Sequence, residues 1–351
     1  MVNPRAGRWL ANVKGEVFRL RIAVDALGGD HAPHAIVAGA LEAVREKDFT
    51  VVLVGPEAVL TPRLAGTGLA GRIEIAEATE VISDLDSPSL AVRRKKQSSL
   101  VVAANLLRTG QVDAVVTAGS TGAFMAAGLL LVGRLEGIDR PALAPMIPTR
   151  NGRGVMLLDA GANVDAKPEH LMQYGVMGAL YAAKVLHRDN PKVALLNVGT
   201  EEGKGNQVSK EAFLLLKGAD LNFVGNIEAR ELLAGQVDVV VCDGFTGNVL
   251  LKALEGMAAT FASMLKEHMT RSWQSKLGAL LLQPSLRGFK RQFDYAEYGG
   301  APLLGINGVL VKCHGSSGPT AIKNGLLQAS RFVEQGIVQS IKESVTPKVR
   351  G

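Results

Sequence analysis

The chain has few residues of the kinds that build disulfide frameworks, membrane spans or nucleic-acid surfaces. Cys242 and Cys313 are the only cysteines among its 351 residues, which argues against a disulfide framework and fits a reducing compartment. No apolar run approaches the about 18 residues that a spanning helix needs. Aromatic residues make up 5% of the chain and do not alternate with basic patches, so binding of nucleic acid is not expected.

Motifs of the common nucleotide and metal sites are missing as well. Gly28 and Gly29 lack the G-x-G-x-x-G spacing of a dinucleotide site, and the segment NVGTEEGKGN does not satisfy the G-x-x-x-x-G-K-[ST] pattern of a phosphate-binding loop. His31 and His34 lie three residues apart with no ligand-rich segment near them in sequence, so capping or loop packing is a better interpretation than a metal site. Neither a cofactor nor a metal is predicted.

The residues that are abundant indicate a large folded core. Apolar residues make up 47% of the chain, and 40 glycines accompany them, enough for one large α/β domain or two fused halves. The net charge of +6 hints at acidic partners, such as a phosphorylated ligand, an acidic protein or an anionic lipid surface. Residues 1–20 are basic and contain no apolar segment, so a poorly ordered extension is a better interpretation than a signal peptide.

Apolar runs alternate with helical patterns along nearly the whole chain, which is typical of βα units. We expect a single catalytic α/β domain over 21–345, with a possible boundary between two closely joined halves near residue 150. The expected strands are 21–25, 50–55, 71–76, 112–118, 142–147, 154–159, 192–198, 221–224, 237–242 and 309–313.

The stretch VDVVVCDGFTGNVLLK, residues 237–252, shows the local pattern most clearly. Its apolar run suits a strand buried on both faces of a parallel sheet. Asp243-Gly244 then interrupts the run before a helical pattern, whose first N–H groups would point, unpaired, into the turn. Taken alone, an ordinary turn between a strand and a helix is the better interpretation of this stretch. The functional interpretation depends on whether other strand ends repeat it.

Several other expected strand ends carry the same small, polar and glycine-rich residues. Because ligands of open α/β sheets bind at the carboxyl ends of the strands, the repetition predicts one crevice for a phosphate-handling or acyl-handling enzyme. The candidate residues are Asp25, Gly28, Gly29, Asp30, Ser120, Thr121, Gly122, Asp159, Asn163, Asn197, Lys204, Gly205, Asn206, Asn226, Asp243, Gly244, Gly247, Asn248, His314, Ser316 and Ser317.

A run of four cations, in RRKKQSSL at 93–100, precedes a serine pair. For Arg93 and Arg94 a solvated basic turn is the better interpretation. Lys95 and Lys96 adjoin serines that could cap a helix, so these two lysines could instead face an anion. Of the two, Lys95 is the candidate for substrate binding.

Segment 249–296 has a helical pattern that is long for this fold, and we predict a helical hairpin. No acidic residue occurs between His268 and Phe293. An apolar tip among cations suits an anionic membrane surface; packing in a subunit interface explains the leucines equally well. We therefore assign the stem to a dimer interface and the tip to membrane contact. The tip residues are Leu277, Leu280, Leu281 and Leu282.

The chain contains a series of short motifs in the following order: VDALGGDHAP, RKKQSSL, TAGSTGA, LDAGAN, NVGTEEGKGN, GNIE, CDGFTGNVLLK, YGGAPLLG and HGSS. In that order the chain resembles the phosphate acyltransferases of bacterial phospholipid synthesis, the PlsX family, over residues 20–340. It departs from them at Ser120, where asparagine is common, and at Thr200, where glycine is frequent. The serine puts in doubt any amide contact at position 120.

The resemblance implies transfer of a long acyl chain from acyl carrier protein to inorganic phosphate, giving acyl phosphate. It also implies a three-layer α/β/α, Rossmann-like fold similar to phosphotransacetylases and isopropylmalate dehydrogenases, usually in a homodimer. The family is cytoplasmic and associates peripherally with membranes. A phosphotransacetylase acting on acyl-coenzyme A and a membrane scaffold without catalysis are the alternatives.

Within that interpretation we expect Lys204, Gly205 and Asn206 to hold phosphate, assisted by Ser316 and Ser317. Backbone N–H groups and a lysine can stabilise both phosphate and the oxyanion that forms on the thioester.

Asn248 and the backbone of Gly247 are candidates for the oxyanion or the substrate arm. His314 could protonate the leaving thiolate, or it could be a structural imidazole. Acylation of Cys242 is not expected, because this residue lies on the buried side of its strand end.

Overall fold

The computed structural model describes residues 19–69, 71–292 and 298–345. The chain divides into two compact units: unit 1 comprises Met1–Ala144, Leu180–Asp189 and Tyr298–Gly351, and unit 2 comprises Pro145–Ala179 and Asn190–Glu297. The chain first leaves unit 1 after Ala144 and later returns to it, so each unit is built from separate stretches of sequence. The extension predicted for residues 1–20 lies almost wholly outside the described residues.

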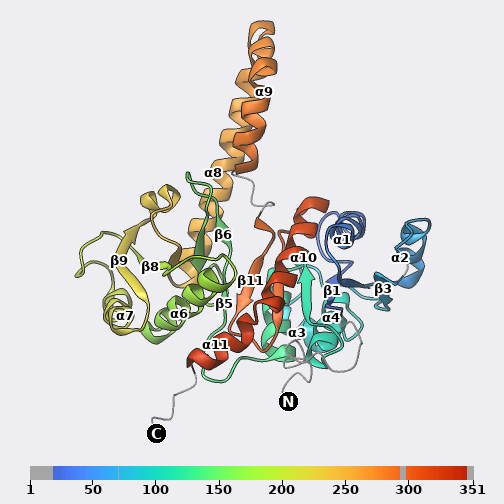
Figure 1. Ribbon diagram of the computed structural model, residues 1–351, viewed down its shortest axis with the longest axis horizontal. Coiled ribbons are helices and arrows are strands. Elements are labelled where there is room, and N and C mark those ends of the chain that lie inside the picture. The colour runs from blue at the N-terminus through green and yellow to red at the C-terminus, as the bar shows by residue number, and fades with distance from the viewer. Residues whose placement is uncertain (1–18, 70, 293–297, 346–351) are drawn as a thin grey trace. The chain divides into compact units, whose positions relative to one another are not determined.

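Unit 1 is built on a seven-stranded sheet with the order β3-β2-β1-β4-β12-β11-β5 (Figure 1). The strands pair in parallel, except that β11 runs antiparallel to both of its neighbours. Their bounds are β1 (Arg21–Asp25), β2 (Thr50–Val54), β3 (Ile73–Ala76), β4 (Ala114–Thr117), β5 (Ala142–Leu143), β11 (Ala301–Leu304) and β12 (Val309–Lys312).

Helices cover both faces of this sheet. Every residue of β2 and β4 is buried, and since successive side chains of a strand point to opposite faces, neither face is open to solvent. Helices α1 and α10 pack against each other, as do α4 and α5. The helices are α1 (His34–Glu46), α2 (Glu57–Leu64), α3 (Pro88–Arg94), α4 (Ser99–Arg108), α5 (Thr121–Ala127), η2 (Gly128–Val132), α10 (Pro319–Glu334) and α11 (Ile337–Val345).

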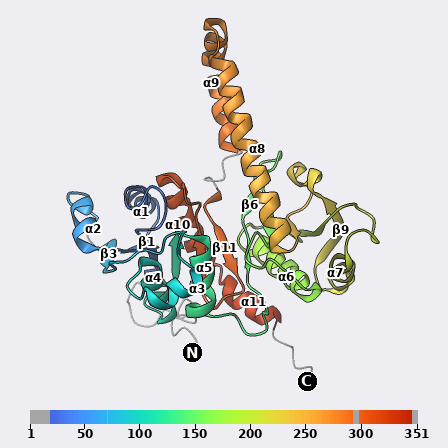
Figure 2. The ribbon, with the colours of Figure 1, turned by 180° about the vertical axis from the view of Figure 1, so that it is seen from behind.

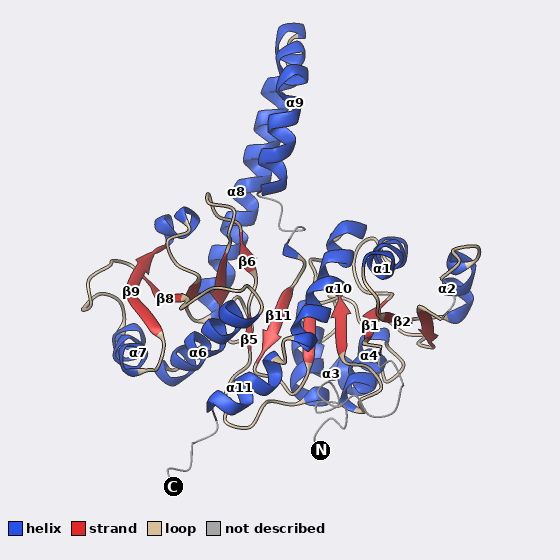
Figure 3. Cartoon of the chain, in the orientation of Figure 1, coloured by secondary structure: helices blue, strands red, loops and turns tan. Residues whose placement is uncertain are grey.

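Unit 2 is built on a five-stranded sheet with the order β6-β7-β10-β8-β9, in which only the β6–β7 pair is antiparallel (Figure 3). Its strands are β6 (Met146–Ile147), β7 (Val155–Leu158), β8 (Lys192–Asn197), β9 (Asn222–Glu228) and β10 (Val239–Val241). Its helices are α6 (Pro168–Lys184, counted with unit 1 from Leu180), α7 (Gln207–Gly218), η3 (Ala229–Ala234), α8 (Gly244–Thr270) and α9 (Trp273–Gln292).

The predicted helical hairpin is formed by α8 and α9. These two helices lie side by side and extend away from the sheet of unit 2 in both views (Figures 1 and 2). Helix α9 continues through Pro284. No helix of the described residues is both long enough and apolar enough to cross a bilayer.

Two sequence predictions are corrected by the sheets. The segment 299–308, which is not among the expected strands, contains strand β11. Its four residues lie between glycines and are too few to show the alternating pattern of a strand. The strand expected at 142–147 is two short strands, β5 and β6, which belong to different sheets. Pro145 stands between them, and proline lacks the N–H that would continue a ladder.

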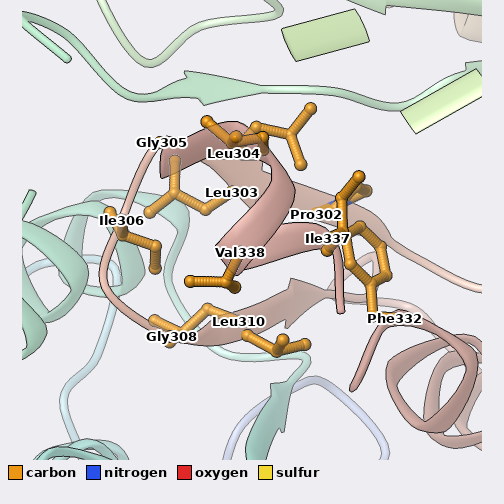
Figure 4. Close-up of a pocket in the computed structure, with 12 residues that line it drawn as sticks. Pro302, Leu303, Leu304, Gly305, Ile306, Gly308, Leu310, Phe332, Ile337 and Val338 are labelled. Carbon is orange, nitrogen blue, oxygen red and sulfur yellow. The ribbon is translucent and has the colours of Figure 1, made fainter. Parts of the chain in front are cut away.

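A small apolar pocket in unit 1 lies beside the amino-terminal end of β12 (Figure 4). Residues of β11, β12, α10 and α11 line it, among them Leu303, Leu310, Phe332 and Ile341. The strand runs from this pocket toward His314, which follows its opposite end. Because every lining side chain is apolar, the pocket offers no group for acid–base or anion chemistry.

Candidate active site

In unit 1 the loops after β1 and β4 are joined through Asp25, which is 2% exposed. One carboxylate oxygen accepts from the Thr117 hydroxyl at 2.7 Å, and the other accepts from the Leu27 amide at 3.2 Å. A Cβ on Gly28 would lie 2.4 Å from the same carboxylate and 2.7 Å from the Gly119 nitrogen. Only glycine permits this approach, so Asp25 and Gly28 hold the loops together.

The loop after β12 joins this group. The Asp30 amide donates to the Gly315 carbonyl at 2.9 Å, and Gly29 adopts a positive φ of +105° at the junction. The Ser316 amide donates to Nδ1 of His314 at 3.2 Å, and the Ser316 hydroxyl lies 2.8 Å from that nitrogen. Because an amide N–H can only donate, Nδ1 is an acceptor and Nε2 carries the proton of the neutral ring.

The other sequence candidates of unit 1 lie around α3 and α5. Ser120 precedes α5, which begins at Thr121, and a Cβ on Gly122 would lie 2.6 Å from the Pro88 ring of α3. Lys95 donates to the Asp86 carboxylate at 2.7 Å and to the Val81 carbonyl at 3.0 Å. The hydrogen bond from Lys95, followed by that from the Ser83 amide, lowers the pKa of Asp86. The charge of Lys95 is therefore engaged locally.

Sequence reasoning overlooked Lys312. This lysine is 8% exposed, and its ammonium group donates to the Cys313 carbonyl and, at 3.4 Å, to the Ala118 carbonyl. It thus places a positive charge where the loops after β4 and β12 begin. A signal was available: a lysine ends an otherwise apolar strand directly before Cys313-His314.

In unit 2 the loop after β7 is fixed by Asp159, which is fully buried. Its carboxylate accepts from the backbone of Ala162 at 3.0 Å, from the backbone of Asn163 at 2.6 Å and from the side-chain amide of Asn163 at 3.0 Å. The same amide also donates to the Tyr174 hydroxyl at 3.0 Å. These contacts hold the turn in one conformation.

The amino terminus of α8 packs on that turn. The Gly244 amide donates to the Asn163 carbonyl at 2.8 Å. A Cβ on Gly247 would lie only 1.9 Å from the Asp159 carbonyl oxygen, so no other residue fits there without a shift of the backbone. The side chain of Asn248 lies beside Gly161.

Asp243 caps α8. One carboxylate oxygen accepts from the Thr246 amide at 2.8 Å, and the other accepts from the Thr246 hydroxyl at 2.7 Å. Both oxygens of this predicted ligand residue are therefore used within the first turn of the helix.

The loop 199–206 after β8 is held by two asparagines. Asn197 donates to the Lys204 carbonyl at 3.1 Å, and Asn226 donates to the Glu201 carbonyl at 2.8 Å. Asn206 caps α7 by accepting from the Ser209 amide at 2.9 Å. Gly205, with a φ of +92°, lies against Asn197.

The side chain of Lys204 is half exposed, and its ammonium nitrogen lies 3.9 Å from a carboxylate oxygen of Glu201. The Lys204 side chain is therefore open to solvent, while the side-chain amides of Asn197 and Asn226 hold the backbone of the loop.

The predicted site residues thus form two sets of loops, one in each unit. Within unit 1 the structure brings together the loops after β1, β4 and β12, and within unit 2 those after β7 and β10 and, separately, those after β8 and β9. The single crevice that the sequence predicted for all of them stays a prediction.

Neither cysteine is suited to act as a nucleophile. Cys242 is 3% exposed, and its pKa is raised well above the ordinary value by burial first and then by the charges of Asp243 and Asp159. Burial raises the pKa of Cys313 to about 12, although Lys312 opposes the shift. Since the thiolate is the reactive form, a covalent acyl-cysteine is disfavoured at both positions.

The fold is that of known acyl-transferring enzymes. A phosphotransacetylase from Streptococcus pyogenes superposes with a TM-score of 0.60 at 18% identity, covering 90% of this chain and 94% of that one. A branched-chain phosphotransacylase from Enterococcus faecalis gives a TM-score of 0.56 at 15% identity, covering 90% and 99%. These likenesses confirm the predicted Rossmann-like α/β/α class.

Sequence relatives identify the family. Residues 20–340 match the family described as fatty acid synthesis protein. The phosphate acyltransferase of Brevibacillus brevis is 55% identical over 333 residues, covering 95% of this chain and 99% of the relative, and that of a Geobacillus species is 54% identical over 327 residues, covering 93% and 98%. The chain belongs to this family of phosphate acyltransferases, as its motifs indicated.

We predict that Gly247→Ala lowers stability. The added methyl group would overlap the Asp159 carbonyl, and overpacking of this kind costs roughly 1–3 kcal/mol. Gly256→Ala is the matched control on the same helix, because its Cβ would meet nothing within 4 Å and alanine is a better helix former by about 1 kcal/mol. Thermal unfolding should place the first variant below the parent protein and the second level with it or above. A Gly247→Ala protein as stable as the parent would contradict the close approach.

Proposed function

We propose that this acyltransferase moves a long fatty acyl chain from acyl carrier protein to inorganic phosphate, releasing acyl phosphate and free carrier protein for phospholipid synthesis. Membership of the phosphate acyltransferase family supports phosphate as the acceptor. The observation that best supports this reaction is the set of loops at strand ends whose backbones are fixed by hydrogen bonds. Both cysteines are buried and so are poorly placed to act as nucleophiles. Such loops suit an attack by phosphate itself, without an acyl-enzyme intermediate.

The reaction needs positioning more than activation. Phosphate is already an oxyanion near neutral pH, with a second pKa of about 6 in its esters. One of its oxygens forms a bond to the thioester carbonyl carbon, and the carbon–sulfur bond breaks. The sulfur leaves as a thiolate, whose thiol has a pKa of about 8.5, so the departing group needs little help from an acid. What remains is to hold phosphate and to stabilise the oxyanion.

In unit 2 we assign phosphate to Lys204, Gly205 and Asn206. The hydrogen bonds that Asn197 and Asn226 make to the loop carbonyls support this assignment, because they fix the loop while the Lys204 side chain remains half exposed. Asn248, beside the Gly161 turn, is assigned to the oxyanion or the substrate arm.

In unit 1 we assign His314 to the leaving sulfur, which the Nε2–H group would stabilise as a hydrogen-bond donor, because Nδ1 accepts from the Ser316 amide and Nε2 therefore carries the proton of the neutral ring. Asp25, Asp159 and Asp243 become positioning residues, since backbone and hydroxyl donors already use both oxygens of each.

The hairpin supports two further proposals, a homodimer through its stem and peripheral contact with an anionic membrane through its tip. Along α8, exposed apolar side chains recur at helical spacing, at Met257, Phe261 and Met264. Near the turn into α9 the exposed leucines follow the exposed cations Arg271 and Lys276. Basic side chains beside apolar ones match the headgroup and acyl layers of an anionic membrane.

The donor is tested by measuring acyl phosphate formed from phosphate and either acyl carrier protein or coenzyme A carrying the same long acyl chain. We expect turnover of the carrier-protein thioester to exceed that of the coenzyme A thioester. Equal kcat/KM for both donors would make this protein a phosphotransacetylase of broad donor range. No acyl phosphate from either donor would leave the scaffold alternative.

We predict that Lys204→Ala raises the apparent KM for phosphate roughly tenfold, because one charge-assisted contact is lost. Lys192→Ala is the control, since Lys192 is an exposed lysine at the opposite end of the same strand, β8. Initial rates over a phosphate series give both values. An unchanged phosphate dependence in the Lys204 variant would remove this residue from the site.

We predict that Leu281→Glu weakens binding to vesicles of anionic lipid about tenfold or more and leaves turnover in solution unchanged. Leu281 is 75% exposed, and burial of a leucine side chain contributes about 1.5–3 kcal/mol. The matched control is Leu214→Glu, at an exposed leucine on α7 of the same unit. Vesicle flotation compares them, and equal binding of the two variants would argue against the membrane tip.

A further inference from the structure

The hydroxyl of Ser317 is a buried polar group without a partner. Ser317 is 4% exposed, and its Oγ finds no hydrogen-bond partner among the described residues. Native proteins keep few such groups, because burial removes the hydrogen bonds that water would otherwise supply. The residue stands immediately before Gly318, the N-cap of α10, so the orphan hydroxyl lies at the head of a 16-residue helix.

The first turn of α10 presents further donors at the same place. No side chain caps the helix, and among the described residues none accepts a hydrogen bond from the backbone N–H of Gly318, Thr320 or Ala321. A Cβ built on Gly318 would meet no atom within 4 Å, so this end of the helix can be approached. Unpaired amides and the positive end of the helix dipole favour an anion.

The charges nearby are mixed. Lys312, at the end of the preceding strand, supplies a buried ammonium group, whereas the Asp30 carboxylate lies 3.7 Å from the Cβ position of Gly315. An anion with several acceptor oxygens suits this setting, because it can use the hydroxyl and two or more amides together.

We infer that Ser317 Oγ and the first-turn amides of α10 bind a phosphoryl oxyanion within unit 1. This site shares no residue with the 199–206 loop. The inference rests on the proposed function for the choice of phosphate: the group is either inorganic phosphate or the phosphodiester of the arm that carries the acyl thioester. Both present the same oxygens to hydroxyl and amide donors.

The test compares Ser317→Ala with Ser330→Ala in the full-length enzyme. Ser330 is a matched control because it lies on α10, thirteen residues after Ser317, is fully buried and also has a hydroxyl without a hydrogen-bond partner among the described residues. Initial rates are measured over phosphate and acyl carrier protein thioester. A rise of about tenfold in the KM for phosphate assigns the site to inorganic phosphate, and a similar rise in the KM for the thioester assigns it to the phosphodiester. If the KM values of Ser317→Ala for phosphate and for the thioester both equal those of Ser330→Ala, the inference is overturned.

Titration calorimetry with inorganic phosphate keeps this result separate from the proposed function. If the parent protein forms no acyl phosphate, the proposed function fails, and the affinity for phosphate alone then decides the inference: equal affinities of the parent protein and Ser317→Ala overturn it. If Ser317→Ala does not fold, Gly318→Pro takes its place. The φ of −82° at Gly318 accepts proline, which removes one amide donor and leaves the hydroxyl in place.

Discussion

The approach of two backbones at Asp159 and Gly247 is the constraint on which unit 2 depends. The helix that carries Asn248 begins against the turn after β7, and its fourth residue touches a carbonyl oxygen that no side chain could approach as closely. This contact fixes where α8 starts and therefore the direction in which the hairpin leaves the sheet. The position of Asn248 and the path of the exposed apolar stripe on α8 thus follow from one glycine.

Three strand ends share one feature, an aspartate that accepts hydrogen bonds from the residues that follow the strand or from a neighbouring strand. Asp25 is the last residue of β1, and Asp159 and Asp243 follow β7 and β10. Each of the three uses both carboxylate oxygens to accept hydrogen bonds from nearby amides or hydroxyls. A carboxylate is itself negatively charged and repels an anion, but by accepting these hydrogen bonds it fixes the backbone around it. The aspartates at the ends of the strands therefore act on the conformation of the loops.

The sequence predicted the parallel strands well because β1, β2, β4, β7, β8 and β10 are apolar runs that end in polar or glycine residues. The pattern did not predict β11, because a strand of four residues between glycines is too short to show the alternation of apolar and polar residues. At the strand ends the sequence located the polar residues but not the hydrogen bonds that they make. Whether Asp243 binds substrate or caps a helix depends on the Thr246 hydrogen bonds, which only the folded chain reveals. The sequence analysis did not select Lys312 as a site residue, because a lysine that ends an apolar strand is usually exposed to solvent, whereas this one is buried.

These features suit a reaction in which the acceptor is already an anion. An enzyme that must deprotonate a weak nucleophile needs a titrating base near it, but phosphate needs donors in fixed positions and a site that does not compete for the acyl group. Buried thiols with raised pKa values meet the second requirement. Loops whose backbone is fixed by aspartates and asparagines suit the first, because donors on such loops would be oriented before substrate arrives and would need little reorganisation in the transition state. The same local elements, a helix start, a glycine and an aspartate that accepts nearby donors, recur at the ends of β1, β7 and β10.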